Sequence, residues 1–104
     1  MEMVIMNLIT NSGEAKSAAM EAIGYAKTFK FEEAHAAIEA SAASLSKAHK
    51  SQTALIQSEA SGDKVELSML LIHAQDHLMN AMTAKDLASE IVDLYQVIYN
   101  MTRK

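Results

Sequence analysis

Apolar side chains recur every three or four positions between residues 5 and 26. The members of this series are Ile5, Leu8, Ile9, Ala15, Ala19, Ala22, Ile23 and Ala26. Such spacing places them on one face of an α-helix, and we predict a helix over residues 3–27. The periodicity loses its phase at residues 28–31, which predicts a break between two helices at that point.

A second apolar stripe follows this break and predicts a helix that starts at Glu32. Its members are Ala34, Ala37, Ile38, Leu45, Ala48, Leu55 and Ile56. The helix is expected to end near Ser61 and Gly62, because glycine is suited to the left-handed conformation that follows a helix C-terminus. Residues 64–99 form the third predicted helix. Short connections make neighbouring helices antiparallel, so we predict an all-α fold, an up-down-up three-helix bundle with residues 1–104 in one domain.

The composition favours helices and excludes several kinds of functional site. The 104 residues include no Pro, no Cys and only three Gly, and the hydrophobic half is mostly Ala, Leu, Ile and Met, which favours helices over sheets. A chain without Cys has neither disulfides nor thiolate chemistry. Its net charge of −4 argues against a nucleic-acid partner, because phosphate binding requires a basic surface.

The N-terminal segment MEMVIMNLIT lacks the marks of a signal peptide or a membrane span. Its second residue is acidic, and its apolar stretch is much shorter than the roughly 20 residues needed to cross a bilayer. We therefore expect a cytoplasmic protein that does not insert into a membrane.

The third predicted helix is apolar on two sides. One side begins with Met69 and Leu70 and continues, in an amphipathic C-terminal half, with Leu87, Ile91, Leu94, Tyr95 and Ile98. The opposite side holds Leu67, Leu71, Ala74, Leu78 and Met82. A helix that is apolar on two sides is usually buried on both, and a three-helix chain can cover only one of them. We therefore expect a partner chain on the other side, which would also extend a small core.

Four polar residues interrupt the first of these sides: His73, Asp76, His77 and Asn80. The first three lie at positions i, i+3 and i+4, so their side chains gather over one turn. They could ligate a divalent metal ion. They could carry a phosphoryl group, since neutral imidazole is a nucleophile near physiological pH. They could also form a polar network without chemistry, and the spacing alone leaves the three interpretations open.

Other positions are informative to a smaller degree. Gly13 lies inside the first predicted helix, where glycine costs about 1 kcal/mol relative to alanine. One interpretation is that another backbone or a phosphate group approaches Gly13 closely and offsets this cost. The other is that Gly13 is a tolerated defect of the helix. His35 and His49 lie among Lys, Glu and Ser residues and are interpreted as surface or interface histidines.

The segment ELSMLLIHAQDHLMNAMTAKD, residues 66–86, resembles the signature of a known family. The family is the lactose/cellobiose-type enzyme IIA of the bacterial phosphoenolpyruvate-dependent sugar phosphotransferase system. The resemblance extends to NLITNSGEAKSAAMEAI and AHKSQTALIQSEASGDKVELS, so it spans nearly the whole chain. It implies a homotrimer of three-helix subunits that forms a nine-helix bundle, in agreement with the second apolar side.

The resemblance also implies roles for the four polar residues of HAQDH. His73 would be phosphorylated by the histidine-phosphocarrier protein and would pass the group to a cysteine of the cognate IIB component. Gln75 and His77 match positions beside the phosphorylated imidazole and are assigned supporting roles. Asp76 matches an aspartate that converges at the trimer axis and, in some members, binds a divalent metal ion such as Mg²⁺, one per trimer. Apart from the resemblance, the position of Asp76 beside the two histidines also allows it to orient one of them in a monomer.

The implied function is phosphoryl transfer during uptake of a β-linked disaccharide, and HAQDH favours cellobiose or diacetylchitobiose over lactose. The sequence departs from the family at the turn between the first two predicted helices. The segment KTFKFEE lacks the glycine that is common there, which leaves only the local geometry of this turn in doubt. The alternative is a non-catalytic helical oligomeric module with a metal-stapled interface. A hydrolase is poorly supported, because no nucleophile elbow or second carboxylate pair is present.

Overall fold

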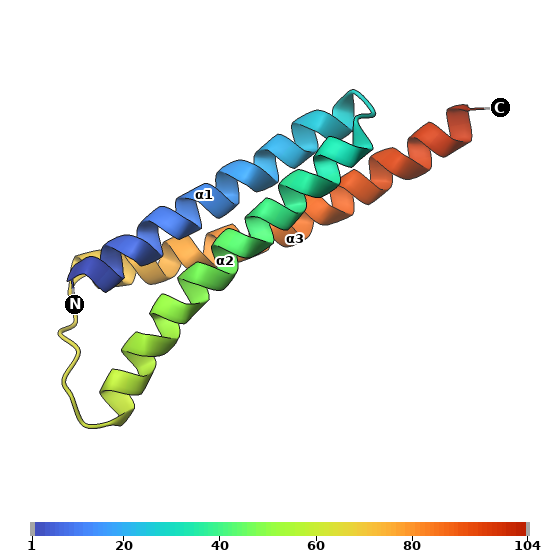
Figure 1. Ribbon diagram of the computed structural model, residues 1–104. Helices are drawn as coiled ribbons and strands as arrows, with labels where there is room; N and C mark the ends of the chain where they lie inside the picture. Colours follow the sequence, from blue (N-terminus) through green and yellow to red (C-terminus); the bar gives the residue numbers. More distant parts are fainter. Residues whose placement is uncertain (1, 104) are drawn as a thin grey trace.

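The computed structural model describes residues 2–103 as three long helices. They are α1 (Glu2–Lys27), α2 (Phe31–Ala60) and α3 (Met69–Thr102), and no strand occurs within these residues. In Figure 1, α1 and α2 run antiparallel and α3 returns in the direction of α1. The bundle measures 62 × 19 × 16 Å. This architecture confirms the predicted up-down-up three-helix fold.

The core of the bundle is built mainly from alanine. The buried side of α1 consists of Ile5, Leu8, Ser12, Ala15, Ala19, Ala22 and Ala26. This list confirms the predicted apolar face, except that Ile9 and Ile23 are only half-buried and Ser12 completes the series. Larger buried side chains gather at the N-terminal end of α1, where Leu8, Leu55 and Leu78 belong to one cluster. Because alanine has no side chain beyond Cβ, the helices can approach closely along the rest of the bundle.

The break between α1 and α2 lies where the loss of phase predicts it. Phe29 occupies the left-handed region with φ 61°, a conformation that costs a non-glycine residue roughly 1–2 kcal/mol. Its ring lies 5.1 Å from that of Tyr99 and 6.1 Å from that of Phe31, measured between centroids. Aromatic packing of this kind offsets the backbone strain, which explains how the turn forms without a glycine.

The connection between α2 and α3 differs from the prediction. The predicted start of the third helix at residue 64 is wrong, since α3 begins at Met69 and residues 63–68 are not helical. The Ser68 side chain accepts a hydrogen bond from the backbone N–H of Leu71 at 3.1 Å and caps the helix. Gly62 adopts φ 94° as predicted. In Figure 1 the end of α2 diverges from the other helices, so the chain needs this extended segment to return.

Only one side of α3 packs against the rest of the chain. Its buried residues are Leu71, Ala74, Leu78, Ala81, Ala88 and Val92. The expectation that one chain covers only one apolar side of this helix is therefore confirmed. Three details of the predicted sides were wrong. Met82 is exposed. The C-terminal half uses Ala88 and Val92 as its core side, while Leu87 and Leu94 are more than half exposed. Leu67 precedes the helix and is also exposed.

No helix within residues 2–103 combines the length and the apolar character that crossing a membrane requires.

Two buried serines provide a matched test of the core. Ser41 Oγ donates a hydrogen bond to the Ala15 carbonyl at 2.7 Å, whereas Ser12 Oγ finds no partner within the described residues. An unpaired buried hydroxyl costs roughly 1–3 kcal/mol, and a satisfied one contributes roughly 0.5–1.5 kcal/mol. We expect Ser12→Ala to raise the free energy of unfolding by about 1 kcal/mol and Ser41→Ala to lower it.

Urea unfolding of both variants at one protein concentration measures this difference. Both substitutions gain the same helix propensity, so the gap between them isolates the hydrogen bond. Equal stabilities for the two variants would contradict the assignment of partners.

Candidate functional site

The two histidines of the predicted cluster lie one turn apart on α3. The ring centroids of His73 and His77 are 5.7 Å apart, with 27° between the ring planes. His73 is exposed and His77 is half-buried. The structure therefore brings these two imidazoles together, and it leaves His73 open to an approaching molecule.

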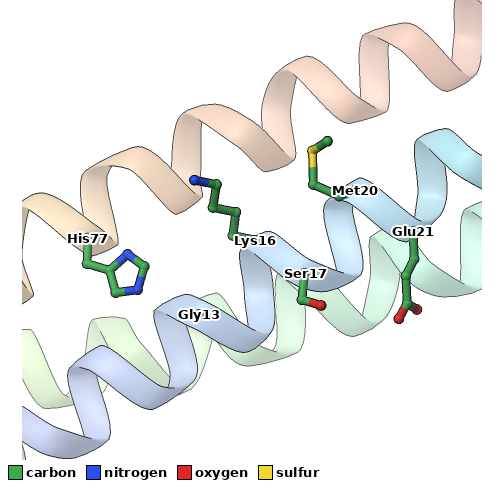
Figure 2. Close-up of a pocket in the computed structure, with 6 residues that line it drawn as sticks. All are labelled: Gly13, Lys16, Ser17, Met20, Glu21 and His77. Carbon is green, nitrogen blue, oxygen red and sulfur yellow. The ribbon is translucent and has the colours of Figure 1, made fainter.

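His77 faces α1 at Gly13. A Cβ placed on Gly13 would lie 3.7 Å from His77 Nε2. An open groove of about 570 Å³ between these helices is lined by Gly13, Lys16, Ser17, Met20, Glu21 and His77. Figure 2 shows the side chains of His77 and Lys16 both directed into the space between α1 and α3. The half-buried imidazole thus shares its groove with a cation supplied by another helix.

Asp76 and Asn80 lie on the side of α3 that the chain leaves uncovered. The Asn80 side-chain amide donates a hydrogen bond to the Asp76 carboxylate at 3.4 Å, and both residues are exposed. Within residues 2–103, no three His, Asp or Glu side chains gather closely enough to hold a metal ion. A metal bound at Asp76 would therefore need further ligands from outside these residues.

Gln75 lies apart from the histidines. Gln52 Nε2 on α2 donates a hydrogen bond to Gln75 Oε1 at 2.7 Å, and Gln75 is half-buried. Two positions along a helix correspond to about 200° of rotation, so Gln75 and His73 point to different sides of α3. Within one chain Gln75 does not line the space around His73, and its supporting role stays a prediction.

Some residues near the site had no signal in the sequence. Lys16 shares a helix face with Gly13, three positions earlier, but nothing in the sequence indicates that this face meets His77. Gln52 is equally unmarked, because its partner lies on another helix. His35 and His49 are exposed, and His49 lines a separate groove between α2 and α3. Their interpretation as surface residues is consistent with these positions.

The site offers an exposed nucleophile, a second imidazole and a nearby ammonium group. An imidazole on an open surface can accept a group from a macromolecular donor and release it to another. The neighbouring His77 and Lys16 can donate hydrogen bonds to an anion. This arrangement suits transfer of an anionic group between proteins better than turnover of a substrate enclosed in a cavity.

Comparisons with known proteins agree with this chemistry. The family model for the lactose/cellobiose-specific IIA subunit of the PTS system matches residues 3–96. The lichenan-specific phosphotransferase enzyme IIA component of Bacillus subtilis is 53% identical, covering 94% of this chain and 89% of its own. The N,N'-diacetylchitobiose-specific EIIA component of Escherichia coli is 43% identical, covering 92% of this chain and 83% of its own.

Solved structures give the same result. The cellobiose-specific enzyme IIA of Bacillus anthracis superimposes with a TM-score of 0.93 at 52% identity, over 95% of this chain and 91% of its own. The Escherichia coli IIA(chitobiose) in complex with HPr superimposes with a TM-score of 0.82 at 41% identity, over 94% of this chain and 95% of its own.

The Gln52–Gln75 hydrogen bond leads to a test of how Gln75 is held. We expect Gln52→Leu and Gln75→Leu each to lower the free energy of unfolding, and the double variant to lose less than the sum, with a coupling of about 1 kcal/mol. A double-mutant cycle by urea unfolding measures the coupling. Strictly additive losses would show that the two side chains do not interact.

Proposed function

The chain belongs to the lactose/cellobiose-specific IIA family of sugar phosphotransferase systems, and on this premise we propose that it carries a phosphoryl group on His73 between two proteins. The observation that supports the proposal most directly is the exposure of the His73 imidazole beside His77 on an uncovered side of α3. The system served would take up a β-linked disaccharide, in keeping with the lichenan, diacetylchitobiose and cellobiose in the names of its relatives.

The transfer consists of two displacements at phosphorus. A neutral ring nitrogen of His73 attacks the phosphohistidine of the donor, a new N–P bond forms, and the donor imidazole leaves. A cysteine thiolate of the cognate IIB component then attacks phospho-His73, an S–P bond forms, and the His73 imidazole is released. Both steps require in-line approach and stabilisation of the phosphoryl oxygens, and an exposed imidazole allows two proteins to dock in turn.

The donor would be the histidine-phosphocarrier protein, since a related IIA has been solved in complex with HPr. Both partners, and the carrier itself, would operate in the cytoplasm, where the sugar is released after transport. The alternative of a non-catalytic helical module has no observation of its own in its favour.

A homotrimer would cover the exposed side of α3. Along it, residues recur at intervals of three, four or seven, as in the seam of a coiled coil. His73, four positions after Met69, lies along one edge of this seam. The seam itself consists of Met69, Asp76, Asn80, Leu87, Leu94, Ile98 and Met101. Apart from Asp76 and Asn80 these side chains are apolar, and all of them are exposed in the single chain. Three parallel copies of α3 would bury this seam in a nine-helix bundle.

In such a trimer the three Asp76 carboxylates would meet at the axis. Like charges at close range repel one another, and a divalent cation relieves the repulsion. Carboxylate and amide oxygens from Asp76 and Asn80 form a donor set that suits a hard cation such as Mg²⁺. We therefore include one such ion per trimer in the proposal, with the role of neutralising charge at the axis.

The phosphocarrier role is tested by substitution of two exposed histidines. We expect the parent protein, incubated with phosphoenolpyruvate, enzyme I and the histidine-phosphocarrier protein, to take up one acid-labile phosphoryl group per chain. His73→Ala should take up none, because the attacking nitrogen is gone, whereas His49→Ala should be labelled like the parent. Intact-protein mass spectrometry measures the label.

Equal labelling of His73→Ala and the parent would exclude His73 as the acceptor. A parent that is never labelled would favour the non-catalytic module. Phosphotransfer from the labelled parent to a panel of IIB proteins would then identify the sugar system.

The placement of Asp76 is tested by its removal. In the presence of a chelator, Asp76→Leu should raise the melting temperature by a few degrees, because it removes the repulsion and adds apolar surface to the seam. Asp93 is exposed and lies outside the seam. Asp93→Leu is therefore the control and should not raise the melting temperature. Thermal unfolding at a fixed protein concentration gives the comparison, and a lower melting temperature for Asp76→Leu would count against the axial position.

A further inference from the structure

We propose that the groove between α1 and α3 receives the oxygens of the phosphoryl group in transit, with Lys16 and His77 as donors and Gly13 as the residue that keeps the space open. The inference rests on the proposed function, adds Gly13 and Lys16 to it as positioning residues, and gives the supporting role of His77 a specific form. Its ligand class is the phosphoryl group of a phosphohistidine.

Gly13 is the first observation. The nearest atom to a Cβ at this position is His77 Nε2, at 3.7 Å, and no backbone of another helix lies closer. Contact at 3.7 Å is ordinary van der Waals distance, so packing does not exclude alanine, although alanine would stabilise the helix by about 1 kcal/mol. The interpretation that Gly13 permits close approach of another backbone is therefore not supported. Glycine instead leaves room beside Nε2 that a methyl group would occupy.

His77 is the second observation. Its ring lies 5.7 Å from the His73 ring, centroid to centroid, so a phosphoryl group on His73 is within reach of His77, which is the groove residue next to His73 on α3. Its Nε2 borders the open space over Gly13. A protonated ring nitrogen at this position can donate a hydrogen bond to a phosphoryl oxygen.

Lys16 is the third observation. It lies one turn beyond Gly13 on α1, and helical side chains lean towards the helix N-terminus, which directs its ammonium back towards the level of His77. In Figure 2 the Lys16 side chain reaches towards α3, while the Glu21 carboxylate at the other end of the groove points away from His77. By contrast, Lys85 pairs with Asp86 and lines the separate α2–α3 groove. A phosphoryl group carries concentrated negative charge, and a positioned cation lowers the barrier to its transfer.

The glycine is tested against a matched control on the same helix. Gly24 also lies within α1, and a Cβ there would meet nothing within 4 Å. Gly13→Ala and Gly24→Ala should raise the melting temperature to a similar degree, because both gain helix propensity. Only Gly13→Ala should slow phosphoryl transfer from the histidine-phosphocarrier protein, by about tenfold, since it fills the space beside Nε2.

The lysine is tested by charge removal and charge rescue. Lys16→Met should reduce the saturating rate of His73 phosphorylation about tenfold with little change in KM for the donor protein. Lys16→Arg should restore most of the rate, and Lys47→Met, an exposed lysine of α2, should leave it unchanged. A loss confined to KM would mean that Lys16 serves docking of the donor, and would overturn its assignment to the phosphoryl oxygens.

A spectroscopic readout separates the groove from the overall activity. Phosphorylation of the parent should shift the ¹⁵N resonance of His77 Nε2, and Gly13→Ala should abolish that shift. If the parent is phosphorylated on His73 but Gly13→Ala and Lys16→Met transfer at the control rates, only the groove inference is wrong. If the parent is not phosphorylated on His73, the proposed function itself is wrong.

Discussion

Close contact between helices through alanine is the constraint on which the rest of this structure depends. Ten of the sixteen buried apolar residues between residues 2 and 103 are alanines. They allow three long helices to lie side by side, but each contributes little apolar area, at roughly 25 cal/mol per Å². Large apolar side chains such as Leu87, Leu94 and Met69 remain on the outside of α3. The chain therefore leaves much of its large apolar surface exposed along α3.

This distribution also positions the candidate site. His77 lies where the packed side of α3 meets its uncovered side and faces α1, whereas His73, one turn earlier, is exposed on the uncovered side. A histidine deeper in the core could not meet a protein partner, and one in the middle of the apolar seam would be buried in an assembly. This position gives a solvent-accessible imidazole, with the side chains of His77 and Lys16 held by the two helices beside it.

Helix α1 is locally less stable where it faces His77. Glycine at position 13 weakens the helix, and its neighbour Ser12 buries a hydroxyl without a partner in the described part of the chain. Local departures of this kind are expected to concentrate where a site imposes its own requirements. At Phe29, by contrast, the strained backbone is offset by contact with other aromatic rings far from the histidines.

The sequence by itself determined the three helices, their up-down-up order, the buried face of α1 and the placing of His73 and His77 one turn apart on α3. These features follow from helical periodicity, which depends only on the order of residues. Tertiary structure decided the late start of α3 at Met69, the separation of Gln75 from the histidines and the groove that joins Lys16 to His77. The physical reason is that each depends on how one helix lies against another, and the periodicity within a single helix carries no information about its neighbour.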